Sequence, residues 1–232
     1  MRYWWGKTGA PPEKIALIPT GIETDQFQPM AGARESLGLH PNKTIVLYCG
    51  RLSPEKGVDY LIKAVKSLLP QRADVELHIL GEGPDKARLL KLVEELDMKD
   101  VVVFHGWVSK EQMPYYYSAA DVCVLPSFSE GLPRVMLEAM ACGSVFLGTD
   151  ITGVVDHIKD GENGFRVRPG DADALAAKLR IILENPDMAR LVAKNAREYA
   201  CRYLDWGVIA KRVREEVFLP LIDQRVSLVA PR

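Results

Sequence analysis

The chain has 232 residues, of which 47% are apolar and 26% are charged, and its formal net charge is −1. This length allows one large domain or two small ones, and the composition is that of a globular protein without a biased tract. A net charge so close to zero provides no global field that would attract nucleic acid or an anionic membrane, so we predict no nucleic-acid partner.

The four cysteines are far apart and include no C-x-x-C pair; they are Cys49, Cys123, Cys142 and Cys201. This usage indicates reduced thiols in a cytoplasmic protein, with peripheral association of the full-length protein with a membrane as an alternative. The N-terminal stretch MRYWWGKTGAPPEK lacks the apolar core of a secretory signal. No apolar run approaches the roughly 20 residues that span a bilayer, so we expect no transmembrane segment.

Short apolar runs alternate with amphipathic ones. In chain order we expect a strand at residues 14–22, a strand at 44–50, a helix at 58–69, a strand at 74–81, a helix at 86–98, a strand at 101–106, a helix at 110–120, a strand at 121–127, a helix at 132–142, strands at 144–149 and 163–167, and two or three helical segments after Asp171. This alternation predicts an α/β fold, a doubly wound parallel sheet of the Rossmann-like type followed by C-terminal helices. Ligands of such sheets bind beyond the carboxyl ends of the strands, which directs attention to the loops there.

The first of these loops follows the apolar strand 44–50 and reads CGRLSPEKG. Gly50 permits close approach of a backbone, and Arg51 and Lys56 place two cations at the same edge of the sheet. A bound pyrophosphate, helped by the N-terminus of the next helix, would explain both cations. The alternative is a solvated loop in which Lys56 pairs with a nearby acid.

The stretch SFSEGLPRVMLEAMACG carries a stronger signal. We expect Pro133 in the first turn of a helix, where a proline's missing N–H costs nothing. The backbone N–H groups near Gly131 and Leu132 would then make the helix start an anion site. Glu130 precedes that site, so we expect it to bind a different group, such as a sugar hydroxyl.

Glu138 lies about two turns into this almost entirely apolar helix. An unpartnered buried carboxylate costs several kcal/mol, so hydrogen-bond donors should surround it, and the vicinal hydroxyls of a ribose would serve. The alternative is an exposed pair with Arg134, four residues earlier, which would contribute only about 0.3–0.5 kcal/mol.

Other candidate motifs are weaker. The glycines at 81 and 83 lack a third glycine at the spacing of a dinucleotide fingerprint. Asp171 and Asp173 imitate a metal-binding D-x-D motif, but helix capping explains them better. His105 and His157 have no ligand partners at metal spacing, so we predict no metal site.

Together these stretches resemble family 4 glycosyltransferases, which are retaining enzymes of the GT-B architecture. The spacing Glu130-x7-Glu138 matches the family signature, and IPTGIETDQFQP, GRLSPEKGVDYLIKA, LHILGEGPDKARL, VVFHGWV and DGENGFRV occur in the family's order. The resemblance covers roughly residues 14–182. Val145 stands where the family often has proline, and Asp156 where it usually has glutamate; neither departure implies loss of function.

The resemblance implies roles for individual residues. The catalytic set would be Arg51 and Lys56, which match the cations that hold the donor diphosphate, and Glu130, which matches the carboxylate that binds the transferred sugar. Glu138 would bind the nucleotide ribose. The remaining substrate-binding positions would contribute main chain: Gly50, Gly131 and Leu132 near the phosphates or sugar, and Gly106, Trp107 and Val108 near the base.

A GT-B enzyme has two Rossmann-like domains, and this chain resembles the donor-binding half. We therefore expect residues 1–13 to be a remnant of the other domain or a linker, residues 14–200 to form the nucleotide-sugar-binding domain, and residues 201–232 to form a helical tail. An acceptor glycan or lipid would bind the absent N-terminal domain, so the isolated chain should be inactive.

The expected reaction moves a sugar from a nucleotide-diphosphate sugar to an acceptor hydroxyl with retention at the anomeric carbon. The nucleotide sugar is a substrate, and no cofactor or metal is expected, because two cations and a helix dipole would neutralise the leaving group. The alternatives are a sugar phosphorylase or an inverting transferase of the same architecture, and a non-catalytic half-protein that binds a nucleotide sugar or a partner.

Overall fold

The computed structural model of the chain describes residues 9, 11, 15–16 and 18–222. The strands are β1 (Thr44–Cys49), β2 (Val75–Leu80), β3 (Val102–Gly106), β4 (Val122–Leu125), β5 (Phe146–Thr149) and β6 (Phe165–Val167). The helices are α2 (Ala33–Ser36), the three-ten turn η2 (Pro54–Lys56), α3 (Val58–Leu68), α4 (Lys86–Glu95), α5 (Met113–Ala119), α6 (Arg134–Ala141), α7 (Ala172–Glu184), α8 (Pro186–Tyr199), the π-helical turn η3 (Ala200–Leu204), α9 (Trp206–Val213) and the π-helical turn η4 (Arg214–Phe218).

The six strands form one sheet in the order β3-β2-β1-β4-β5-β6, and every neighbouring pair is parallel. This order confirms the predicted doubly wound α/β fold. The strand order reverses between β1 and β4, and in such sheets the crevice outside the carboxyl ends at that point is where ligands bind.

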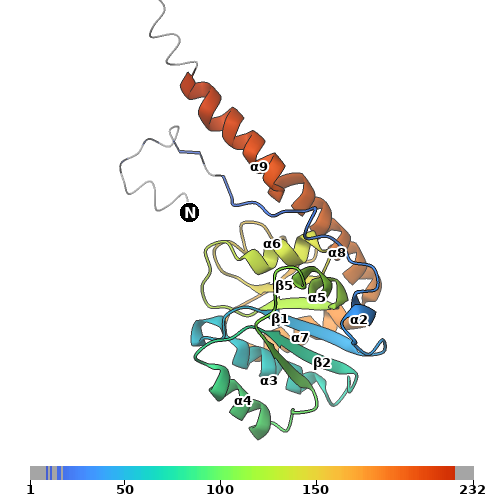
Figure 1. Ribbon diagram of the computed structural model, residues 1–232. Coiled ribbons are helices and arrows are strands. Elements are labelled where there is room, and N and C mark those ends of the chain that lie inside the picture. The colour runs from blue at the N-terminus through green and yellow to red at the C-terminus, as the bar shows by residue number, and fades with distance from the viewer. Residues whose placement is uncertain (1–8, 10, 12–14, 17, 223–232) are drawn as a thin grey trace, which may run out of the picture.

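Helices cover both faces of the sheet (Figure 1). α5, α6 and α8 lie on one face, and α3, α4 and α7 lie on the other. Because both faces are covered, every residue of β4 and β5 is buried. On α3 the buried residues recur at helical spacing: Val58, Leu61, Ile62, Ala64, Val65 and Leu68.

The structure corrects the expectations at the amino-terminal side. The strand expected at residues 14–22 does not form in the described part of that stretch, where Ile22 makes only an isolated bridge to Asp205. Residues 33–36 form the short helix α2, which the sequence pattern did not predict. Most of the expected remnant at residues 1–13, and residues 223–232 of the expected tail, lie outside the described residues.

The C-terminal helices confirm the prediction for the tail as far as residue 222. Asp205 caps α9 by accepting a bond from the N–H of Gly207 at 2.7 Å, and it also accepts one from the hydroxyl of Thr24 at 2.6 Å. These bonds join the chain segment before α2 to the start of α9, which projects away from the sheet (Figure 1). None of the described helices is both long and apolar enough to cross a bilayer.

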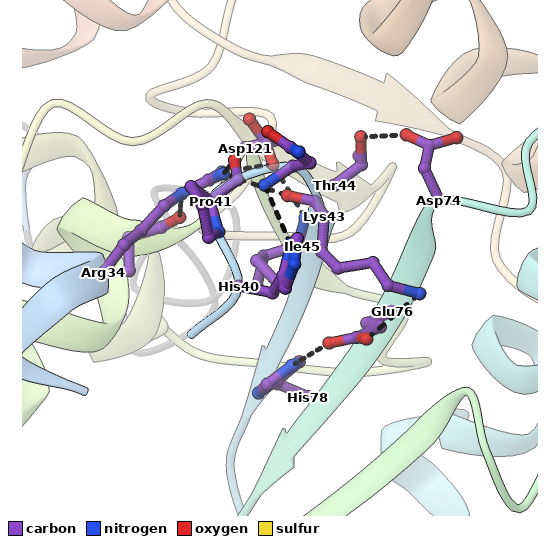
Figure 2. A network of polar contacts seen from close by, with 12 residues as sticks. Arg34, His40, Pro41, Lys43, Thr44, Ile45, Asp74, Glu76, His78 and Asp121 are labelled. Atoms are coloured by element: carbon purple, nitrogen blue, oxygen red, sulfur yellow. Dashed lines mark hydrogen bonds and ion pairs between the residues drawn. The ribbon is translucent and has the colours of Figure 1, made fainter. Parts of the chain in front are cut away.

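A polar network secures the amino ends of the central strands (Figure 2). The carboxylate of Asp121 accepts bonds from Nη2 of Arg34 and from the N–H of Ile45, each at 2.7 Å. Asp74 accepts a bond from the hydroxyl of Thr44 at 2.6 Å and two from the guanidinium of Arg72. These bonds hold the start of β1 against its neighbours, at the edge of the sheet opposite the expected ligand site.

The Asp74 contacts lead to a pH-dependent prediction. The Arg72 guanidinium and the Thr44 hydroxyl hold the pKa of Asp74 well below its ordinary range. A lowered pKa in the folded state means that the carboxylate stabilises the fold above about pH 4 and loses this contribution as the pH falls further. We expect Asp74→Asn to lower the free energy of unfolding by about 1 kcal/mol at pH 7, after allowance for the solvent exposure of the pair.

Urea unfolding at pH 7 and pH 3 would check this. The difference between wild type and Asp74→Asn should shrink at pH 3, because the carboxyl of the unfolded wild-type chain then takes up a proton that the folded carboxylate does not. Asp100→Asn, at an exposed position after α4, is the matched control and should change little at either pH. A stability difference for Asp74→Asn that is as large at pH 3 as at pH 7 would contradict the assignment.

Candidate functional site

The two loops that flank the reversal of strand order are packed against each other. The N–H of Phe128, after β4, donates to the carbonyl oxygen of Glu55, after β1, at 2.9 Å. Gly57 has φ +64°, and a Cβ there would overlap the carbonyl oxygen of Pro126, so glycine is required for this approach. The segments CGRLSPEKG and SFSEGLP, predicted separately, therefore form one site.

Lys56 and Glu130 meet directly across this junction. Their Nζ and Oε1 atoms are 2.7 Å apart, and the side chains are only 21% and 15% exposed. The hydroxyl of the buried Ser127 donates to the same Oε1 atom at 2.8 Å. The alternative considered for Lys56, a pair with a nearby acid, is thus present, and its partner is the carboxylate expected to bind the sugar.

Arg51 lies in the same loop and is exposed. Its carbonyl oxygen accepts a bond from the hydroxyl of Tyr48 at 2.9 Å, which anchors the backbone and leaves the guanidinium toward solvent. No salt bridge joins Arg51 to an acidic side chain among residues 18–222. The two predicted cations therefore differ, because Lys56 is held by Glu130 whereas no acidic side chain among residues 18–222 forms a salt bridge with Arg51.

Glu138 lies on α6 with only 12% of its side chain exposed. The hydroxyl of Tyr117 donates to its Oε2 atom at 2.8 Å, and Nε of Arg134 is 3.4 Å from its Oε1 atom. Burial raises the pKa of Glu138, while Tyr117 and Arg134 act in the opposite direction. The alternative pair with Arg134 is therefore present. It is not an exposed surface pair, however, because the Glu138 side chain is mostly buried.

The surroundings of Arg134 involve two residues that the sequence analysis did not single out. Arg134 Nη2 is 3.8 Å from Oε2 of Glu23, and Lys110 Nζ is 3.6 Å from Oε1 of the same carboxylate. Glu23 lies in the segment before α2, and Lys110 lies between β3 and α5. The sequence analysis assigned no role in the site to Ser127, Tyr117, Glu23 or Lys110. For Tyr117 the sequence did offer an indication, because a buried carboxylate such as Glu138 needs a hydrogen-bond donor.

The start of α6 differs from the prediction in one detail. Pro133 has ψ 119° and precedes the helix, which begins at Arg134, so the proline is not in the first turn. Gly131 lies in open space, since a Cβ there would meet no atom within 4 Å. A Cβ on Gly153 would overlap the carbonyl oxygen of Gly131, so the loop after β5 also closes on this position.

The expected base-facing loop follows β3, beside the loop after β2. The N–H of Gly81 donates to the carbonyl oxygen of Gly106 at 2.6 Å. Trp107 is 78% exposed, and Val108 packs partly against the core. The structure places Gly106, Trp107 and Val108 at the carboxyl edge of the sheet, where they were predicted to lie.

The remaining candidates have structural roles. Asp171 caps α7 by accepting a bond from the N–H of Ala174, as predicted. Nδ1 of His78 and Nε2 of His105 are 2.8 Å apart, and burial together with the neighbouring His78 lowers the pKa of His105 to about 4. All four cysteines are free thiols.

Comparison with known proteins extends this picture. The sequence profile described as "Glycosyl transferases group 1" matches residues 31–199. A D-inositol 3-phosphate glycosyltransferase of Streptomyces scabiei is 33% identical over 93% of this chain and 51% of its own length. The chain spans about half the length of the curated relatives it matches.

Solved structures show the same fold. A sucrose-phosphate synthase from Thermosynechococcus elongatus has 35% identity and a TM-score of 0.82, with coverage of 90% of this chain and 53% of that one. Anabaena Alr3699/HepE in complex with UDP has a TM-score of 0.86 with coverage of 94% and 61%, and at 24% identity it supports the fold alone.

The contact between Lys56 and Glu130 can be tested without any ligand. In a double-mutant cycle of Lys56→Met and Glu130→Gln, we expect a coupling of about 1–2 kcal/mol in the free energy of unfolding, because both side chains are mostly removed from water. The pair formed by Lys91 and Glu95 is the control, since its side chains are 76% and 57% exposed. For Lys91 and Glu95 the coupling should be about 0.3–0.5 kcal/mol. Equal coupling free energies for the two pairs would show that burial does not strengthen the contact between Lys56 and Glu130.

Proposed function

The chain belongs to the group 1 glycosyl transferase family, and we propose that it is the donor-binding half of a retaining glycosyltransferase. The enzyme would move a sugar from a nucleoside-diphosphate sugar to an acceptor hydroxyl. Because the chain spans about half the length of its curated relatives, we further propose that a second half binds the acceptor, a glycan or a lipid.

One observation carries this proposal. Lys56 and Glu130 meet where the strand order reverses, which is where doubly wound sheets bind their ligands, and Glu138 lies on the helix that follows the same loop. A cation paired with a partly buried carboxylate, followed by a second carboxylate in an apolar helix, is a costly arrangement for stability alone. A ligand with both anionic and hydroxyl groups would use all three side chains.

The diphosphate is assigned to the loop after β1 and to the start of α6. An ammonium group has three donors, so Lys56 can hold Glu130 and a phosphate oxygen together. Arg51 is exposed in the same loop and can turn its guanidinium to the same anion, and the N–H groups at the helix start add a partial positive charge. Departure of the diphosphate is the difficult step, and these groups stabilise the charge that develops on it.

The hydroxyl-bearing parts of the donor are assigned to the two carboxylates. Oε1 of Glu130 accepts the bonds from Lys56 and Ser127, which leaves Oε2 for a hydroxyl of the transferred sugar. Glu138 would accept the ribose hydroxyls. Membership of the glycosyl transferase family supports a sugar donor as the ligand class, and its nucleoside diphosphate is proposed from the resemblance of the two loops.

Three further parts of the proposal follow from the same chemistry. The two cations and the helix start balance the charge of the leaving diphosphate, so the reaction is proposed to need no metal. Retention at the anomeric carbon is proposed from the resemblance of the Glu130 and Glu138 spacing. A cytoplasmic location is proposed from the cysteine usage, because the four cysteines are far apart in the sequence and none is joined to another in a disulfide.

Calorimetry of the chain with UDP, GDP and ADP tests the ligand class and the cations together. We expect one of these nucleotides to bind, and Arg51→Ala or Lys56→Ala to weaken binding about tenfold or more, which is about 1.4 kcal/mol for a lost charge-assisted contact. Lys91→Ala, on the exposed side of α4, is the matched control and should bind as wild type does.

A transfer assay tests whether the chain needs a second half for activity. With a nucleotide sugar but without a second half, the chain should bind its donor and transfer negligible sugar. Binding that is indifferent to Arg51 and Lys56 would refute the assignment of the diphosphate. Robust transfer by the chain alone would refute the proposal that the acceptor binds elsewhere.

A further inference from the structure

Tyr117 is a completely buried tyrosine whose hydroxyl is directed at Glu138. It lies on α5, which packs beside α6 on the same face of the sheet (Figure 1). Its Oη atom is 2.8 Å from Oε2 of Glu138. A buried phenol has few conformations, so this donor is fixed in space before any ligand arrives.

The two oxygens of Glu138 therefore have different surroundings. Oε2 is bonded to the immobile ring of Tyr117, whereas Oε1 faces the guanidinium of Arg134 at 3.4 Å. Arg134 is 51% exposed and its contact with Oε1 is long, so its guanidinium is held less tightly than the ring of Tyr117. Oε2 is therefore fixed by a buried side chain, whereas Oε1 can exchange its contact with Arg134 for a contact with a ligand.

We propose that Tyr117 is a positioning residue of the donor site: its hydroxyl fixes Oε2 of Glu138 so that Oε1 is presented to the ribose hydroxyls. This inference rests on the proposed function and adds to it a residue from outside the Glu130 to Glu138 segment. Tyr117 itself does not touch the nucleotide; it acts through Glu138.

The position of Tyr117 also affects the ionisation of Glu138. The titratable groups that face Glu138 are Tyr117 on α5, Arg134 and Cys142 on its own helix, Cys49 on β1 and Lys110 before α5. Burial raises the pKa of Glu138, and the Tyr117 bond is the largest of the effects that lower it. Removing this donor should raise the pKa of Glu138 further, so nucleotide binding should begin to fail at a higher pH.

The test compares Tyr117→Phe with wild type by calorimetry from pH 5.5 to pH 8, with whichever of UDP, GDP and ADP the wild-type chain binds most tightly. We expect affinity to fall about tenfold at pH 7.5 and the acidic limb of the affinity profile to move to higher pH. In a Glu138→Gln background the same change should have little further effect, because the role of Tyr117 runs through that carboxylate. A purely structural role would not produce this dependence on Glu138.

Tyr199→Phe is the matched control. It removes a hydroxyl that lies 3.1 Å from Nδ1 of His157, on α8 and away from the site, and affinity should be unchanged. If Tyr117→Phe does not fold, 3-fluorotyrosine at position 117 replaces it, because a more acidic phenol donates a stronger bond. The acidic limb should then move to lower pH.

The outcomes separate this inference from the proposed function. If wild type binds a nucleotide and Tyr117→Phe binds it equally well with the same pH profile, the positioning role is overturned while the proposed function stands. If wild type binds none of the three nucleotides, both fail. A carbon-13 NMR titration of the Glu138 carboxyl without nucleotide gives an independent readout, and an unchanged pKa in Tyr117→Phe would also overturn the role.

Discussion

The reversal of strand order between β1 and β4 is the constraint on which the rest of the site depends. Because the crossovers run in opposite directions from these two strands, their loops emerge side by side instead of being covered by a helix. The loop after β1 supplies Lys56, and the loop after β4 supplies Glu130, at 2.7 Å. The ion pair needs both loops, because one supplies the cation and the other supplies the carboxylate.

The two edges of the sheet use charge differently. At the amino edge, Asp74 and Asp121 are each bonded to a guanidinium and to groups of β1, and these bonds need no ligand. At the carboxyl edge, Glu130 and Glu138 have one well-held oxygen each and one that is less committed. Acids of the first kind stabilise the fold, whereas acids of the second kind leave part of their hydrogen-bonding capacity for a ligand.

Most elements were predictable because their signals are local. The apolar runs of β1, β4 and β5 and the helical spacing of α3 depend only on neighbouring residues, and the structure confirms them. The predictions that were wrong concern segments whose conformation depends on residues far away in the sequence or on the surrounding fold. Residues 14–22 have the composition of a strand, but Ile22 bonds to the chain around Asp205 instead of to the sheet. Pro133 has an extended ψ angle, so it lies outside the helix.

The sequence by itself determined the α/β class through periodicity, and the spacing of Glu130 and Glu138 singled out the segment that we propose binds the ligand. Only the tertiary structure decided which groups those carboxylates meet. Lys56 is 74 residues from Glu130, and Tyr117 is 21 residues from Glu138. Such contacts are set by the order of the strands and by the packing of α5 against α6. A local sequence pattern does not give the distance between two side chains that lie far apart along the chain.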